Sequence, residues 1–278
     1  MRSSNPVFSR RGFSRDNGSA GFNATQQPQA GNPYATNPYA QQAQTAGQPY
    51  AAPAPAQPQA GRMTIDDVVS RTGMTVGLVV VAAAFAWITD LSLGLAIGAA
   101  LVAMVLALVQ SFKRKAVPAL ILAYAAFEGL FLGAISNYID GYVNGAAMQA
   151  VLGTMAVFAA VLVMYKTRII RVTQRFYRFV MAAAIGFILL MGVNLLFAVF
   201  GGGDGLGFRS GGMGILFGVI GIVLGALFLA LDFKQVEDGI AYGAPREESW
   251  LAAFGLTLTL VWIYLEFLRL IAILQGDN

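Results

Sequence analysis

Four ionisable side chains lie within long apolar stretches of the chain, where a charge is costly. They are Glu128, Asp232, Glu266 and Arg269. An ionisable residue inside a membrane-spanning segment generally faces the interior of a helix bundle or a water-filled path, because hydrocarbon does not solvate it. Two acids facing one interior could bind a cation or share a proton near neutral pH, and losing that proton would add repulsion that opens a path. These residues are therefore the first candidates for a functional site.

The spacing of these residues leaves several arrangements open. Arg269 follows Glu266 by three positions, so the two can pair on one helix. Glu128 can instead pair with Arg269 across helices, and Asp232 is either part of a site or merely the end of its span. Asp232 and Glu266 are candidate cation contacts, because carboxylate oxygens suit hard cations such as calcium. We expect no cofactor, with Ca²⁺ or protons as permeant ions.

Composition removes several kinds of chemistry. The 278 residues include neither Cys nor His, which excludes thiolate nucleophiles, imidazole bases and most transition-metal sites. An intramembrane serine protease usually needs a His base, and a retinal protein needs a Schiff-base Lys in a late span, where this chain has none. We therefore predict that the protein is not an enzyme.

Seven apolar stretches are long enough to position these side chains within a bilayer. Hydrophobic residues make up 57% of the chain and charged residues 12%, against about 45–50% and about 25% in soluble domains. Because a hydrocarbon core of ~30 Å requires ~20 helical residues, we predict an all-α membrane protein, a seven-transmembrane helix bundle. The predicted spans are residues 74–90, 92–111, 117–139, 147–165, 178–200, 213–233 and 250–274.

The sixth span carries its acid on a glycine-rich face. At 100° per residue, the residues that fall within about 60° of one another are Gly214, Gly218, Gly221, Gly225 and Asp232. The four glycines form two G-x-x-x-G pairs, a spacing that lets helices approach closely. We therefore expect this face to pack against another helix, with Asp232 directed away from lipid.

The level of Asp232 in the membrane depends on where the sixth span ends. If the span ends at Phe233, Asp232 lies at the membrane edge, whereas Glu266 lies about 24 Å into the next helix. If the helix continues to about residues 239–242 and turns at residues 243–245, the two acids approach one level. We predict the extended helix.

The N-terminal segment has a different character from the rest of the chain. Residues 1–62 are rich in Gln, Ala, Asn, Pro and Gly and repeat the pattern Asn-Pro-Tyr-Ala. Such a segment cannot bury enough apolar surface to offset its chain entropy, so we predict a disordered tail that either docks a partner or has no such role. The membrane domain, residues 63–278, is expected to open with a short interfacial helix. Thr64 would cap this helix, and Asp67 could pair with Arg71.

Loop charge predicts the orientation. The segment before the first span carries six Arg, and the second, fourth and sixth loops are also basic. The first and third loops have no Lys or Arg. Because basic loops stay in the cytoplasm, we expect the N-terminus inside and the C-terminus outside. The net charge of +4 is spread between apolar stretches, so we expect the lipid bilayer, and not nucleic acid, as partner.

Three motifs, in this order and in these spans, resemble those of the Bax inhibitor-1 family in its bacterial branch. They are Met63-Thr64-Ile65-Asp66-Asp67-Val68-Val69 before the first span, Glu128-Gly129-Leu130-Phe131-Leu132-Gly133 in the third, and Leu231-Asp232-Phe233 followed by Trp262-Ile263-Tyr264-Leu265-Glu266-Phe267-Leu268 in the last two. The resemblance covers residues 63–274.

This resemblance implies a pH-sensitive calcium leak channel in a bacterial plasma (inner) membrane, gated by protonation of acids in the last two helices. By position, Asp232 matches the first acid of the pH sensor and Glu266 the second, where many members carry Asp. No Arg of an early span matches the family's basic partner, so Arg269 is a candidate substitute. Two other functions stay open: a non-catalytic regulator of a membrane protease or another complex, and a proton-coupled transporter.

Overall fold

The computed structural model describes residues 61–113, 115–201, 206–208 and 210–276, and seven long helices make up most of them. The helices are α1 Ile65–Ile88, α2 Leu93–Phe112, α3 Pro118–Asp140, α4 Ala146–Lys166, α5 Gln174–Gly201, α6 Gly211–Ala241 and α7 Ser249–Gly276, with a short 3₁₀ helix, η2, at Arg246–Glu248. Each long helix is apolar enough to cross a membrane. The prediction of an all-α, seven-span membrane protein is confirmed. The predicted tail falls outside the described residues, apart from Gly61 and Arg62.

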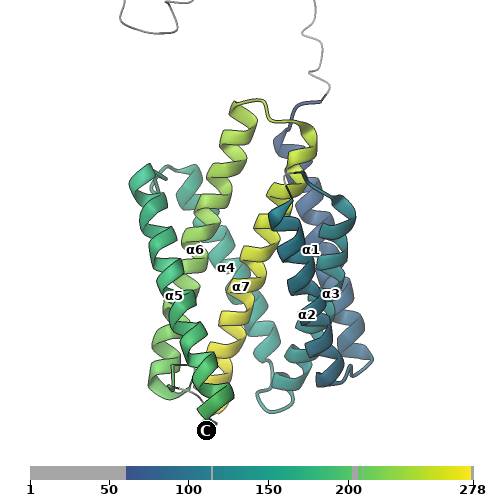
Figure 1. Ribbon diagram of the computed structural model, residues 1–278, viewed down its shortest axis with the longest axis vertical. Coiled ribbons are helices and arrows are strands. Elements are labelled where there is room, and N and C mark those ends of the chain that lie inside the picture. Colours follow the sequence, from purple (N-terminus) through teal and green to yellow (C-terminus); the bar gives the residue numbers. More distant parts are fainter. Residues whose placement is uncertain (1–60, 114, 202–205, 209, 277–278) are drawn as a thin grey trace, which may run out of the picture. The chain divides into compact units, whose positions relative to one another are not determined.

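Helix α7 lies at the centre of the bundle (Figure 1). It packs against α1, α3, α4 and α6. Its side chains at Leu256, Glu266 and Leu268 are all buried, although they are spread over more than half of the helix circumference. A helix with so many buried directions must be surrounded by neighbours, so α7 is the element against which the other helices are positioned.

Helices α1 and α3 approach closely because glycine occupies the contact positions. A Cβ atom added at Gly129 would lie 2.7 Å from Cβ of Ala82, and one added at Gly133 would lie 2.7 Å from Cα of Ala83. Both distances are too short for any residue with a side chain. This contact fixes the rotation of α3, so that Glu128 points about 100° away from the α1 interface.

Helix α6 continues well past the apolar stretch and ends at Ala241. The turn that follows includes Gly243 with a φ of +69°, a conformation that glycine adopts without strain. The polar last turns are held along the helix, since Nζ of Lys234 lies 2.8 Å from Oδ1 of Asp238. The prediction of an extended helix is confirmed, and an end at Phe233 is wrong.

The start of α1 is bound to the α6–α7 turn by an antiparallel bridge between Arg62 and Pro245. The backbone N–H of Met63 donates to the carbonyl oxygen of Ala244 over 2.8 Å, and that of Arg246 donates to Gly61 over 2.8 Å. We call residues 61–71 together with residues 244–250 the N-terminal clasp. Because α6 and α7 meet at this turn, the clasp connects the first helix to the helix pair that carries Asp232 and Glu266.

Side chains of α1 complete the clasp. Thr64 caps the helix, as predicted, and the structure shows that it does so in a capping box with Asp67. Asp67 pairs with Arg246 at 2.7 Å, so the expected pair with Arg71 is wrong; Arg71 instead donates to the carbonyl oxygen of Arg246 over 2.5 Å and lies 5.1 Å from the ring centre of Trp250. The helix is also continuous from Ile65 to Ile88, so the expected interfacial helix is the first part of α1 and not a separate helix within the described residues.

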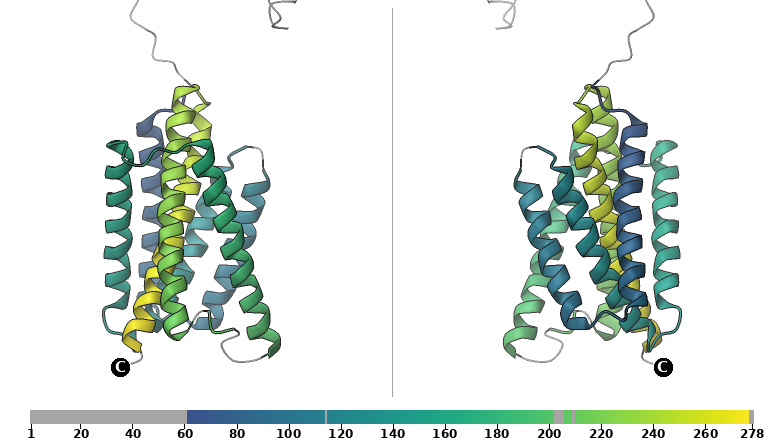
Figure 2. Two further views of the ribbon diagram at one scale, coloured as in Figure 1. Left: turned by 90° about the vertical axis from the view of Figure 1, so that its left-hand side faces the viewer. Right: turned by 90° about the vertical axis from the view of Figure 1, so that its right-hand side faces the viewer.

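Helix α5 lies at the edge of the bundle and packs mainly against α6 (Figure 1, Figure 2). Its link to the centre includes Phe187, whose ring centre lies 5.9 Å from that of Trp262 on α7. Much of the rest of α5 is exposed, including Leu189 and Leu196. This loose attachment leaves room between α5 and the α2–α3 pair.

Successive helices run in opposite directions, so the loops alternate between the two ends of the bundle (Figure 1). The α2–α3, α4–α5 and α6–α7 loops lie at the end where α1 begins. The loops predicted to be cytoplasmic from their charge therefore share one end. That this end faces the cytoplasm stays a prediction.

Candidate functional site

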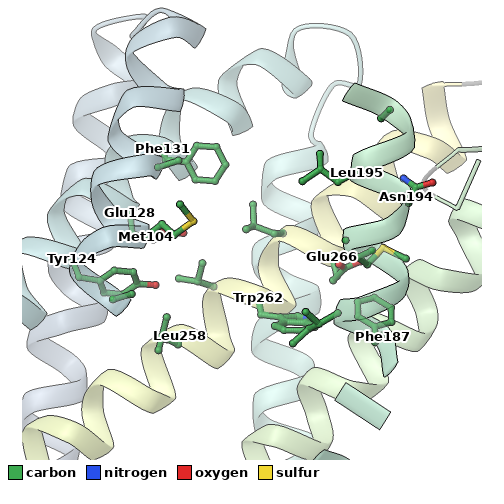
Figure 3. A pocket seen from close by; sticks show the side chains of 18 of the residues that line it. Met104, Tyr124, Glu128, Phe131, Phe187, Asn194, Leu195, Leu258, Trp262 and Glu266 are labelled. Carbon is green, nitrogen blue, oxygen red and sulfur yellow. The ribbon is translucent and has the colours of Figure 1, made fainter. Parts of the chain in front are cut away.

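A cavity of about 940 Å³ lies between α2, α3, α5 and α7. Its lining is mostly apolar, and the acids among its lining residues are Glu128 and Glu266. Figure 3 shows Glu128 and Tyr124 on the α3 side, and Glu266 and Trp262 on α7 towards the α5 side. Two of the four ionisable residues selected from the sequence thus face the same space within the membrane-spanning helices.

Glu128 enters the cavity from the middle of α3. The α1–α3 contact turns this side of α3 towards the cavity, and Tyr124, one turn earlier, packs edge-on against Phe254 with ring centres 5.3 Å apart. The side chain of Glu128 is half-buried. Within the described residues its carboxylate makes neither a hydrogen bond nor an ion pair, so it is open to a water molecule or a cation in the cavity.

Glu266 reaches the same cavity from α7 and is 8% exposed. Its Oε2 accepts a hydrogen bond from Nη2 of Arg269, which lies one turn further along the helix. The carboxyl group also packs against α6, where a Cβ atom added at Gly221 would come within 2.8 Å of its carbon. Glycine at position 221 therefore makes the space that the Glu266 side chain occupies.

Asp232 contacts α7 at another place and is not among the residues that line the cavity. Its Oδ2 accepts a hydrogen bond from Oγ1 of Thr259 over 2.6 Å. A Cβ atom added at Gly255 would lie 3.5 Å from its Oδ1. Asp232 therefore lies on the α6 face that packs against α7, with partners different from those of Glu266.

Although α6 extends beyond Phe233, Asp232 and Glu266 do not lie at the same level along the bundle. Along α7, Thr259 precedes Glu266 by seven residues, or about 10 Å at 1.5 Å per residue. Along α6, Gly221 precedes Asp232 by eleven residues, or about 16 Å. The two acids are thus separated by about 10–16 Å along the bundle, because Asp232 is nearer than Glu266 to the turn that joins α6 and α7.

Glu128 and Glu266 also lie at different heights in the cavity. Helices α3 and α7 run in the same direction, and a hydrogen bond of 2.6 Å between the hydroxyl groups of Ser136 and Tyr264 fixes their register. Glu128 precedes Ser136 by eight residues and Glu266 follows Tyr264 by two, so the carboxylates are about 15 Å apart along the bundle. The alternative ion pair between Glu128 and Arg269 is not formed, since Arg269 lies still further along α7.

A family model described as Bax inhibitor 1 like matches residues 5–276. The chain belongs to the Bax inhibitor 1-like family. The match extends beyond residues 63–274, where the motifs of the sequence had placed the resemblance, and takes in nearly all of the predicted tail. No curated protein matches the chain.

This Bax inhibitor 1-like protein does not gather its acids into a metal cage. In the described part of the chain, no group of three or more acidic side chains lies close enough to hold a metal ion. Glu128, Asp232 and Glu266 are instead spread over two sides of α7 and different heights. Isolated carboxylates suit brief contact with a hydrated cation better than tight binding, which needs several oxygen ligands at once.

Two further residues of the candidate site in this Bax inhibitor 1-like protein were not selected as site residues from the sequence. Asn194 of α5 lines the cavity, is buried, and accepts hydrogen bonds from the backbone N–H of Leu206 and Phe208 over 2.9 and 3.4 Å. Trp262 lines it from α7 and donates from Nε1 to the carbonyl oxygen of Gly221 over 3.2 Å. The signal for Asn194 was present, because it is an isolated amide in an apolar span; Trp262 was noted only as part of the motif in the last span.

Proposed function

We propose that this protein is a pH-sensitive cation leak channel, with calcium as the ion, in a bacterial plasma membrane with its N-terminus in the cytoplasm. Its path includes the cavity between α2, α3, α5 and α7, and protonation of the acids in the last two helices, Asp232 and Glu266, gates it. The role is not catalytic. The observation that carries the proposal is that Glu128 and Glu266 face one cavity among transmembrane helices.

Charge explains how such a cavity would respond to pH. When Glu128 and Glu266 are ionised, the two carboxylates outweigh the single guanidinium of Arg269 and draw cations in. When Glu266 is protonated, Arg269 loses the negative charge beside it and repels cations. Protonation of Asp232 alters the contact of α6 with α7 through its bond to Thr259. We therefore expect the leak to be larger at pH 8 than at pH 6.

Calcium flux into liposomes that contain the purified full-length protein tests the proposal across pH 6–8. Glu128→Gln and Glu266→Gln each remove one carboxylate from the cavity, so we expect a several-fold lower flux at pH 8. Asp232→Asn should mainly flatten the pH dependence, because Asp232 does not line the cavity. Glu247→Gln is the matched control: this side chain is exposed on η2, and its loss should leave flux unchanged.

Two results would contradict the proposal. Calcium flux equal to that of empty vesicles at every pH would exclude a leak channel and favour a regulator of a membrane protease or another complex. Proton movement without calcium movement would favour a proton-coupled transporter.

A further inference from the structure

The segment between α4 and α5 carries a group of five cations. Within thirteen positions, from the last residue of α4 to the second turn of α5, lie five cations, Lys166, Arg168, Arg171, Arg175 and Arg178. We call these five residues the basic segment. The sequence from Gly141 to Gly201 contains no Asp or Glu, so no neighbour along the chain neutralises them.

The structure leaves these cations directed to the outside of the protein. All five side chains are exposed. None of them forms a hydrogen bond or an ion pair within the described part of the chain, in contrast to Lys234, which pairs with Asp238 on its own helix. A concentrated charge without internal counter-ions attracts anions from outside.

The position of the basic segment places it at the surface of a bilayer. It joins the ends of two membrane-spanning helices, and large apolar side chains alternate with its cations. Ile169 is 72% exposed and Phe179 is 64% exposed. A surface of this kind suits the boundary between headgroups and acyl chains, where guanidinium groups meet phosphate while apolar side chains enter the hydrocarbon.

The face of α5 below the cations is suited to an acyl chain. At 100° per residue, Arg175, Arg178 and Phe179 point away from Val180 and Ala184, the buried side of the helix. The exposed side chains that continue this outward face along α5 are Leu189, Val193 and Leu196. Cations therefore lie directly above an apolar strip on a single face of one helix.

We infer that the basic segment and the outward face of α5 bind an anionic phospholipid. The guanidinium groups of Arg171, Arg175 and Arg178 hold its phosphodiester headgroup, and an acyl chain lies along the apolar strip. An acidic protein is a poorer fit, because acidic side chains account for the cations alone, whereas a phospholipid accounts both for the cations and for the exposed apolar side chains Ile169 and Phe179. The binding is independent of any ion leak.

Such binding would act on the cavity through α5. This helix forms one cavity wall and is otherwise held mainly by α6. A lipid that fixes the first turns of α5 therefore restricts the wall that has the fewest protein contacts, and the effect reaches the cavity without any change in α7.

Spin-labelled lipids in reconstituted vesicles give a direct test. The full-length protein is placed in phosphatidylcholine vesicles, and the association constant of spin-labelled phosphatidylglycerol relative to spin-labelled phosphatidylcholine is measured at low and high salt. We expect a ratio of several-fold that falls as salt rises. The variant Arg171→Gln/Arg175→Gln/Arg178→Gln should bring the ratio close to one, while the same three positions changed to Lys should keep most of it.

The matched control removes three charges from the same end of the bundle, at the α2–α3 loop: Lys113→Gln/Arg114→Gln/Lys115→Gln. It should retain most of the lipid preference. An equal loss in both triple variants would overturn the inference, because diffuse charge and not this surface would then be responsible. A ratio near one for the unchanged protein would also overturn it and would leave an acidic protein as the partner of the segment. Circular dichroism of each variant confirms that the helices are intact.

Discussion

Glu266 and Arg269 combine a local pairing with burial in the centre of the bundle. Their spacing of three residues brings the side chains together on one helix, and the side chains are only 10% and 14% exposed. A buried pair of this kind adds little net stability, because both charges lose water, but it makes each partner dependent on the other. At the residue scale, the pair is what allows a charged carboxylate to remain in an apolar cavity.

Removing one partner of the Glu266–Arg269 pair should therefore lower the free energy of unfolding more than removing both charges. Arg269→Leu leaves the carboxylate of Glu266 without its guanidinium, and we expect the free energy of unfolding in detergent micelles to fall by about 3–5 kcal/mol. The double variant Glu266→Gln/Arg269→Leu should regain most of this loss. Arg178→Leu, at an exposed site on α5, is the control and should change little. A double variant no more stable than Arg269→Leu would show that the pair does not govern stability here.

Sequence alone reached this pair because the contact is local. The sequence could not predict that Glu128 and Glu266 share a cavity, because this arrangement depends on the register between α3 and α7. Contacts between the two helices, such as the one between Tyr124 and Phe254, determine that register. Helix periodicity fixes the direction of a side chain on its own helix, but not the height at which a neighbouring helix presents its own.

Helices of this bundle touch at glycines, and these contacts determine which faces turn inward. Gly133 of α3 lies against the backbone of α1, whereas Gly98 of α2 has open space beside it. A methyl group that meets backbone cannot be accommodated by rotation of a side chain. At the element scale, close contact between α1 and α3 is therefore the condition for Glu128 to face the cavity.

Alanine at these two glycines should give opposite results. Gly133→Ala should lower the free energy of unfolding by about 1–3 kcal/mol, the usual cost of overpacking, because the new Cβ would lie 2.7 Å from Cα of Ala83. Gly98→Ala should be neutral or slightly stabilising, since alanine favours a helix. Unfolding midpoints in micelles provide the measurement, and equal midpoints for the two variants would contradict the close approach of α1 and α3.

The N-terminal clasp should control the mobility of the α6–α7 turn. Arg71→Ala removes the hydrogen bonds to Arg246 and Ser249 and the contact with Trp250. We expect faster hydrogen exchange of backbone amides in residues 61–71 and 244–250, measured by mass spectrometry. Lys115→Ala, in the α2–α3 loop at the same end, is the control. Unchanged exchange in both segments would mean that Arg71 does not hold the turn.

The seven spans were predictable because the length and apolar character of each stretch are enough to identify a membrane-spanning helix. The length of α6 was harder, since its last turns are polar and are retained by local ion pairs and by packing of Ile240 near Met63. Hydropathy depends only on the local sequence, so it does not predict contacts between distant segments. For the whole molecule, topology was therefore accessible from composition, whereas the depth of each functional residue was not.

Orientation can be tested directly because the natural chain has no cysteine. Tyr142 and Tyr242 are exposed and lie in loops at opposite ends of the bundle. In intact cells, a membrane-impermeant maleimide should label Tyr142→Cys, while Tyr242→Cys should react only after permeabilisation. The reverse pattern would contradict the positive-inside assignment and would place the basic segment on the outer face.

The loose attachment of α5 has a consequence for how the protein senses its bilayer. Helix α5 has 28 residues, of which residues 179–201 follow the last cation of the basic segment and extend over about 35 Å, against a hydrocarbon core of ~30 Å. A helix longer than the hydrocarbon thickness relieves the mismatch by tilting, and α5 can tilt with the least disturbance of its neighbours. Thinner membranes should therefore tilt α5 further and move the cavity wall that it forms, so the width of the cavity should depend on the thickness of the membrane.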